Sequence, residues 1–272
     1  MSPQSPLRVL ITGGSGGLGR AIGARLAESG AHVGVLGRTD SRVASAVTEI
    51  RAFGGRATPL VADVLDAPSL ESAVDRFAEE AGGIDCVVLG AGRLTAVGPL
   101  ELVDFESWRL DLETTLGGAG RTIRATLPRL RDSADPSVIA LVGPGVNGEV
   151  GFAAGYAAAQ AGLARLIESL DREWAGGPLR IYGVNPGLVP TPLMLSLLDR
   201  PEARRWLPRF TEAFAEGKEV GPACAAEMVA WLAAERPAEL SGRIVPALLS
   251  PALLELRLSK IADEGLNVLR LR

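Results

Sequence analysis

Residues 8–19 read RVLITGGSGGLG, and this stretch decides the fold. Its first part, Arg8–Thr12, is apolar and rich in branched side chains, which predicts a buried strand. Five of the next seven residues are glycine, and glycine permits a tight turn and a close approach of backbone N–H groups to a phosphate. Gly17–Glu28 then predicts a helix, whose N-terminus favours an anion. This strand, turn and helix together predict a dinucleotide-binding turn at Thr12–Gly19.

Short apolar runs alternate with helix-length amphipathic stretches along the rest of the chain, which predicts a parallel sheet covered on both faces. The predicted strands are Leu7–Thr12, Ala31–Leu36, Arg56–Ala62, Ile84–Leu89, Ser137–Val142, Leu179–Val184 and Arg243–Pro246. The predicted helices are Gly17–Glu28, Ser41–Ala52, Pro68–Glu80, a long one from about Leu102 to Leu130, Ala153–Trp174, pieces over Leu193–Glu216, and Pro222–Glu235. We expect one α/β domain over residues 1–272, with a cofactor-binding core at 7–190, a substrate lid at 191–218 and a C-terminal tail at 248–272.

Composition excludes several classes of function. The net charge is −4, which gives no electrostatic basis for binding nucleic acid or an anionic membrane. The two cysteines, Cys86 and Cys224, are far apart and form no metal-ligand pattern. The one histidine, His32, is expected at the surface, so a mechanism that needs a histidine base is excluded. No stretch has the features of a signal peptide or membrane span, and we expect a cytoplasmic protein without a metal.

The turn Thr12-Gly13-x-x-x-Gly17-x-Gly19 resembles the cofactor turn of the short-chain dehydrogenases/reductases, and the likeness extends to about residue 246. It implies a doubly wound, Rossmann-type domain with a seven-stranded parallel sheet. It also implies a small-molecule substrate and a homodimer or homotetramer. By this resemblance the cofactor contacts are Thr12, Gly13, Ser15, Gly17, Leu18, Gly19, Arg38, Asp63, Val64, Ala91, Gly92, Gln160, Pro186, Gly187, Val189 and Thr191.

The end of the second predicted strand indicates which nicotinamide cofactor is preferred. An acidic residue at position 37 would bind the 2′-hydroxyl of NAD, and this chain has Gly37 followed by Arg38. A guanidinium can hold a phosphate through paired hydrogen bonds, and Ser15 could add a hydroxyl to the same phosphate. We therefore predict NADP(H) rather than NAD(H).

The resemblance implies four catalytic residues, namely Asn, Ser, Tyr and Lys, and this chain departs from three of them. Thr115 stands at the Asn position, Gly143 at the Ser position, Tyr156 is kept, and Gln160 stands at the Lys position. A neutral Gln160 cannot lower the pKa of a phenol as a nearby cation does. Tyr156 as a proton donor is affected least, because the neutral phenol is already the donor form.

Other polar residues could take part at the site. Arg93 follows Ala91-Gly92 and is expected to face the cleft, and Asn147 and Glu149 lie in the loop before Tyr156. With Gly143, they are the candidate substrate contacts. For Arg93, Asn147 and Glu149 the alternative, a polar loop residue in water, is favoured over a role in the chemistry.

Three functions remain open on the sequence. The first is an NADPH-dependent carbonyl reductase with Tyr156 as proton donor. The second is a non-redox enzyme of the same fold, such as a dehydratase, isomerase or cyclase acting on a specialised metabolite. The third is a non-catalytic NADP(H)-binding or regulatory subunit.

Overall fold

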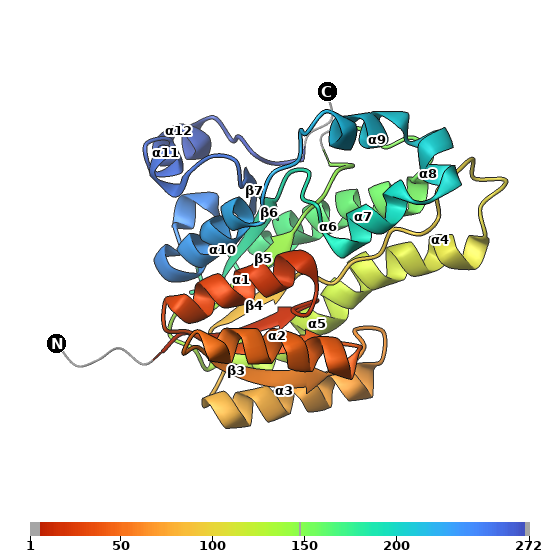
Figure 1. Cartoon of the computed structure of the whole chain (residues 1–272). Helices are drawn as coiled ribbons and strands as arrows, with labels where there is room; N and C mark the ends of the chain where they lie inside the picture. Colours follow the sequence, from red (N-terminus) through yellow and green to blue (C-terminus); the bar gives the residue numbers. More distant parts are fainter. Residues whose placement is uncertain (1–5, 147, 270–272) are drawn as a thin grey trace.

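The computed structural model describes residues 6–146 and 148–269, and its described residues form one α/β domain around a parallel sheet (Figure 1). The strand order is β3-β2-β1-β4-β5-β6-β7. The strands are β1 (Arg8–Thr12), β2 (His32–Gly37), β3 (Arg56–Val61), β4 (Cys86–Leu89), β5 (Ser137–Leu141), β6 (Arg180–Asn185) and β7 (Arg243–Pro246). The predicted doubly wound, Rossmann-type fold is confirmed. The order reverses between β1 and β4, and ligands bind such sheets at the carboxyl ends of the strands at this reversal.

Helices cover both faces of the sheet, which explains why the strands are apolar along their whole length. One face packs against α1 (Gly17–Glu28), α2 (Asp40–Ala52) and α10 (Ala223–Glu235). The other packs against α3 (Ala67–Ala81), α5 (Gly118–Arg131) and α6 (Ala154–Glu173). On α1, for example, Ile22 and Leu26 are four residues apart and fully buried, as one apolar helix face requires.

The long helix predicted from Leu102 to Leu130 is divided in the structure. It consists of α4 (Phe105–Leu112), one π-helical turn η1 (Glu113–Gly117) and α5. Within this glycine-rich stretch, a β-carbon on Gly118 would lie 2.6 Å from Cγ2 of Val64. The chain's own Val64 therefore requires the glycine, and the π turn sets the position of Thr115 beside the loop that follows β4.

His32 is buried, so its predicted surface position is wrong. Its side chain is 5% exposed and its Nε2 lies 2.9 Å from Oγ1 of Thr58. The ring also makes an edge contact with Phe77. His32 begins β2 and so lies at the amino end of the sheet, away from the carboxyl ends of β1 and β4.

Two helical segments complete the domain. The α7–α9 segment comprises α7 (Pro192–Leu198), α8 (Pro201–Trp206) and α9 (Pro208–Ala215), and it lies at the carboxyl ends of the strands. After α10 come a short 3-10 turn, η2 (Ala238–Leu240), and β7. The tail then forms α11 (Pro251–Glu255) and α12 (Leu258–Asp263), drawn in dark blue beside α10 in Figure 1.

The tail packs on the body of the same chain. Leu254 and Ile261 are buried in the cluster formed with α10. The backbone N–H of Ile244 in β7 donates to the carbonyl of Asn267 at 2.8 Å, so the tail covers part of the outer edge of the sheet. None of the helices described is both long and apolar enough to cross a membrane.

Candidate active site

The turns that follow β1 and β4 are joined by the hydroxyl of Thr12. This hydroxyl accepts from the N–H groups of Gly90 and Ala91, at 3.2 and 3.4 Å, and donates to the carbonyl of Val88. Gly13 has a φ of +67°, and a β-carbon on it would lie 2.6 Å from the Gly90 carbonyl oxygen. Residue 13 therefore has to be glycine, and Thr12 holds the two turns at a fixed separation.

The start of α1 fits a pyrophosphate. A β-carbon on Gly19 would overlap the carbonyl of Gly13, so glycine is needed where the turn meets the helix. No side chain caps the N-terminus of α1, and its first turn holds no acidic residue. Backbone N–H groups and the positive end of the helix are thus available to an anion. Leu18 packs its side chain against the core below.

The end of β2 fits a 2′-phosphate better than a bare ribose hydroxyl. A β-carbon on Gly37 would lie 2.5 Å from Oγ of Ser15, so an acidic side chain at position 37 would displace Ser15. Arg38 is exposed, and its Nη1 lies 3.8 Å from Oδ2 of Asp63. Asp63 also accepts from the N–H of Leu65 at 2.9 Å. The end of β2 therefore presents the hydroxyl of Ser15 and the exposed guanidinium of Arg38, two groups that can donate hydrogen bonds to a phosphate.

The turn after β6 lies beside the start of α1. Asn185 accepts from the N–H of Gly187 at 2.9 Å, and Gly187 has a φ of +77°. Thr191 caps α7 by accepting from Met194, and a β-carbon on Gly17 would lie 3.2 Å from Cβ of Thr191. Pro186 and Val189 are buried beneath this turn. The structure therefore brings the predicted carboxamide turn and the phosphate turn together.

Tyr156, Gly143 and Gln160 meet at the carboxyl end of β5. The Tyr156 hydroxyl lies where a β-carbon on Gly143 would stand, so the two groups would overlap. Gln160 is buried, and its Oε1 accepts from the N–H of Gly143 at 2.8 Å. The amide of Gln160 is thus engaged with β5 and lies next to the phenol.

Burial dominates the acidity of Tyr156. The side chain is 6% exposed, and this loss of water raises the pKa of Tyr156 to about 12. A hydrogen bond from the Gln160 side chain acts in the opposite direction and lowers the pKa. Burial has the larger effect, because an amide cannot stabilise a phenolate as a cation does. The phenol is therefore neutral near pH 7.

A buried carboxylate beside the site was missed by the sequence reasoning. Asp111 on α4 has no exposed surface and accepts from the N–H groups of Thr95 and Ala96 and from the Thr95 hydroxyl. The Nε of Arg93 lies 3.4 Å from Asp111 and donates to Thr95. The sequence offered no clear signal for it, because the helix positions that flank Asp111 on the same face are mostly polar or glycine. Asp111 holds the loop after β4 and balances the charge of Arg93.

The remaining predicted site residues lie on the π turn and in the loop after β5. The hydroxyl of Thr115 accepts from the N–H of Arg93 at 3.3 Å. Gly92, which is exposed, lies close to the same hydroxyl. The π turn and the loop after β4 are therefore joined. Glu149 is exposed, and Asn147 lies outside the described residues.

The α7–α9 segment closes over Tyr156 with apolar side chains. Leu197, Ala203 and Leu207 belong to one buried cluster with Tyr156. Arg200 anchors the segment to the body by donating to the Thr95 carbonyl at 2.8 Å. Residues 191–218 therefore contribute to the buried cluster that contains Tyr156, and their role as a substrate lid stays a prediction.

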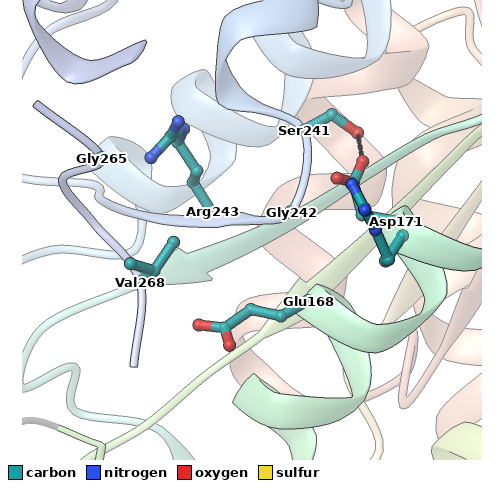
Figure 2. Close-up of a pocket in the computed structure, with 8 residues that line it drawn as sticks. Glu168, Asp171, Ser241, Gly242, Arg243, Gly265 and Val268 are labelled. Atoms are coloured by element: carbon teal, nitrogen blue, oxygen red, sulfur yellow. Dashed lines mark hydrogen bonds between the residues drawn. The ribbon is translucent and has the colours of Figure 1, made fainter. Parts of the chain in front are cut away.

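A separate cavity of about 250 Å³ lies at the other end of the sheet, between α6, the start of β7 and the tail (Figure 2). Its polar groups hold the fold together. Ser241 donates to Asp171, and Arg243 donates to the carbonyls of Glu239 and Leu266. Because these groups already have partners and lie far from the β1 and β4 turns, we place the active site at the carboxyl ends of the strands instead.

Comparison with known proteins shows the family to which the chain belongs. Residues 8–201 match the short chain dehydrogenase family. A short chain dehydrogenase of Pseudocercospora fijiensis is 31% identical over 186 residues, which are 68% of this chain and 60% of that protein. The 3-oxoacyl-(acyl-carrier-protein) reductase of Escherichia coli (strain K12) is 31% identical over 236 residues, covering 86% of this chain and 92% of that one.

Among solved structures, a variant of the actinorhodin polyketide ketoreductase with NADPH is 26% identical to this chain. The two superpose with a TM-score of 0.81 over 93% of this chain and 99% of the ketoreductase.

Proposed function

Because the chain belongs to the short chain dehydrogenase family, we propose that it is an NADP(H)-dependent reductase of a small-molecule carbonyl, with Tyr156 as the proton donor. The observation that carries this proposal is the grouping of Tyr156, Gln160 and Gly143 at the end of β5. This grouping keeps the phenol protonated and fixes the direction of its hydrogen bonds.

NADP(H) binds along the carboxyl ends of β1, β2, β4 and β6. The start of α1 would hold the pyrophosphate, Ser15 and Arg38 would hold the 2′-phosphate, and the turn at Gly187 and Thr191 would contact the nicotinamide. The fit of Gly37 against Ser15 and the similarity to a ketoreductase solved with NADPH support this choice of cofactor. When bound, the reduced nicotinamide supplies a hydride to the carbonyl carbon.

Gln160 positions the hydroxyl of Tyr156. The N–H of Gly143 is a donor, so the atom of Gln160 that faces it is the oxygen, and the amide nitrogen is left to donate. A hydrogen bond from Gln160 to Tyr156 then occupies a lone pair of the phenolic oxygen. The phenolic O–H remains free to donate to the carbonyl oxygen of a substrate.

The acidity of Tyr156 favours reduction over oxidation. With a pKa of about 12, roughly one phenol in 10⁵ is ionised at pH 7. Reduction needs the neutral form, which transfers its proton to the substrate oxygen as the C–H bond forms at the carbonyl carbon. Alcohol oxidation needs the phenolate as base, and that form is scarce at neutral pH.

A second function, NADP(H) binding without catalysis, is favoured by one observation. Apolar side chains of the α7–α9 segment belong to one buried cluster with Tyr156, which is 6% exposed. A phenol closed off in every state of the protein could not reach a substrate. The two functions differ in whether the segment opens.

Two measurements separate these functions. Titration with NADPH, followed by cofactor fluorescence, is expected to saturate, with NADH binding more weakly. A panel of neutral and charged ketones and aldehydes, followed by loss of NADPH absorbance at 340 nm, is then expected to include reduced substrates. Failure to bind NADPH at millimolar concentration contradicts both functions. Binding without oxidation by any carbonyl supports the non-catalytic function and contradicts the reductase.

A further inference from the structure

The chemistry of the α7–α9 segment indicates what kind of carbonyl compound reaches Tyr156. We propose that the substrate is an uncharged ketone with apolar groups on both sides of the carbonyl, which binds by taking the place of apolar side chains that now pack on Tyr156. This inference rests on the proposed function, because it concerns the substrate of the same site.

The surfaces that meet at Tyr156 are apolar on both sides. The body contributes Leu94, Val97 and Ala153, and the α7–α9 segment contributes Leu197, Ala203 and Leu207, all of them buried. A carbonyl group that reaches the phenol must separate these surfaces. The separation exposes apolar area to water unless the substrate covers it again. An apolar substrate restores the lost burial, whereas a charged one also has to give up its own hydration.

Two arginines beside this cluster, Arg93 and Arg200, already have partners, and a third, Arg205, stacks on the Trp206 ring at 4.5 Å from its centroid. Arg93 is paired with the buried carboxylate of Asp111 at 3.4 Å. Arg200 donates to the Thr95 carbonyl at 2.8 Å and lies 3.8 Å from Glu202. A carboxylate or phosphate on the substrate would have to displace these partners, and displacing Asp111 would leave a buried charge without its cation. At Arg93 and Arg200 the existing contacts therefore favour a neutral substrate.

An aromatic contact closes the outer edge of the cluster. The ring of Trp206 on α8 lies 4.8 Å from that of Phe152, between ring centroids. Phe152 has a φ of +63°, which is strained for a bulky side chain, and its carbonyl accepts from the N–H of Gly98 at 2.8 Å. These contacts hold Phe152 against the segment. The Trp206 ring packs against the cluster and is therefore available to cover the apolar end of a substrate.

Calorimetric titration tests this inference without requiring turnover. Acetophenone and 4-acetylbenzoate present the same ketone with and without a carboxylate, and each is titrated into the full chain with and without NADP⁺, which cannot reduce them. We expect acetophenone to bind at least about tenfold more tightly than 4-acetylbenzoate. Equal or tighter binding of 4-acetylbenzoate overturns the inference, and so does failure of acetophenone to bind.

Two leucines on α7 provide a matched pair of variants. Leu197 is 1% exposed and lies in the cluster, whereas Leu195 is 44% exposed. Leu197→Ala is expected to weaken acetophenone binding at least about threefold, and Trp206→Ala is also expected to weaken it. Leu195→Ala is expected to change acetophenone binding less than about twofold. Equal effects of Leu195→Ala and Leu197→Ala contradict the inference. If acetophenone binds as expected but no ketone oxidises NADPH, the reductase proposal fails and the binding preference stands.

Discussion

The hydroxyl of Tyr156 lies in the space that a side chain on residue 143 would fill. Glycine at position 143 therefore lets the phenol approach the backbone of β5 directly. At the same place the N–H of Gly143 holds the amide of Gln160 at 2.8 Å. The side chains of Tyr156 and Gln160 on α6 thus both contact residue 143. A substitution at that residue should therefore alter the position of both side chains.

Enlarging residue 143 should destabilise the protein through this overlap. Gly143→Ala is expected to lower the free energy of unfolding by about 1–3 kcal/mol, because an added methyl group forces the phenol to move. In the Tyr156→Phe background the loss should be smaller, since the overlapping oxygen is gone. Urea denaturation of the four proteins measures the difference. Gly151, whose β-carbon would meet nothing within 4 Å, provides the control Gly151→Ala, expected within about 1 kcal/mol of wild type. The same loss in both backgrounds would show that the overlap has no energetic effect.

Arg38 should determine the preference between the two nicotinamide cofactors. Arg38→Ala is expected to raise the Kd for NADPH about tenfold, because a charge-assisted contact with the 2′-phosphate is lost. The Kd for NADH, which lacks that phosphate, should change little. Fluorescence titration of each cofactor measures both constants. Arg56→Ala, at the opposite end of the sheet on β3, is the control, and an equal loss of NADPH binding in it would argue against a specific role for Arg38.

The pH dependence of reduction should reflect the high pKa of Tyr156. Reduction requires the protonated phenol, and burial raises the pKa of Tyr156 to about 12, so kcat/KM should not fall between about pH 7 and pH 10 through ionisation of this group. In Gln160→Lys a cation stabilises the phenolate and lowers its pKa by roughly 1–3 units, so the loss of activity should move to lower pH. Gln160→Glu places an anion beside the phenol, so the pH at which activity is lost should not decrease. Circular dichroism confirms that each variant is folded across the range. Identical profiles for the Lys and Glu variants would be incompatible with Tyr156 as the donor.

His32 should make the protein sensitive to acid. Burial lowers the pKa of His32, Arg56 and Arg51 lower it further, and Glu80 opposes them. As the pH falls below about 6.5, the histidine of the unfolded chain gains a proton before that of the folded chain does. Folding stability contributed by the neutral ring is therefore present above that pH and is lost as the pH falls through the folded-state pKa. Urea midpoints at pH 7.5 and pH 5 should differ more for wild type than for His32→Gln. An equal difference in the two proteins would mean that His32 has no part in the acid sensitivity.

The arrangement of the sheet could be predicted because the strands are apolar along their whole length and the turn at Thr12–Gly19 has one structural interpretation. The break between α4 and α5 could not, since no pattern in the sequence marked the π turn at Glu113–Gly117, and the contact of Gly118 with Val64 joins residues distant in sequence. His32 was misplaced for a related reason. A polar ring beside a helix end is usually solvated, and only the position of Thr58 on the neighbouring strand gives it a buried partner.

The sequence predicted which residues of the candidate site lie close together, but not the contacts that their side chains make. Alignment of the motifs indicates that Gly143, Tyr156 and Gln160 are close together, but not that the phenol fills the space beside Gly143. Asp111 escaped notice because its partners, Thr95 and Ala96, are separated from it by a loop and most of α4. Contacts between residues distant in sequence determine these details.

The reaction rate of Tyr156→Phe tests the central claim most directly. This variant keeps the ring that packs beneath the α7–α9 segment and removes the proton that we propose is transferred. With a carbonyl substrate of the wild-type protein, and with NADPH binding shown to be unchanged by fluorescence, the rate of NADPH oxidation is expected to fall at least about tenfold. An unchanged rate in Tyr156→Phe would contradict the assignment of Tyr156 as the proton donor.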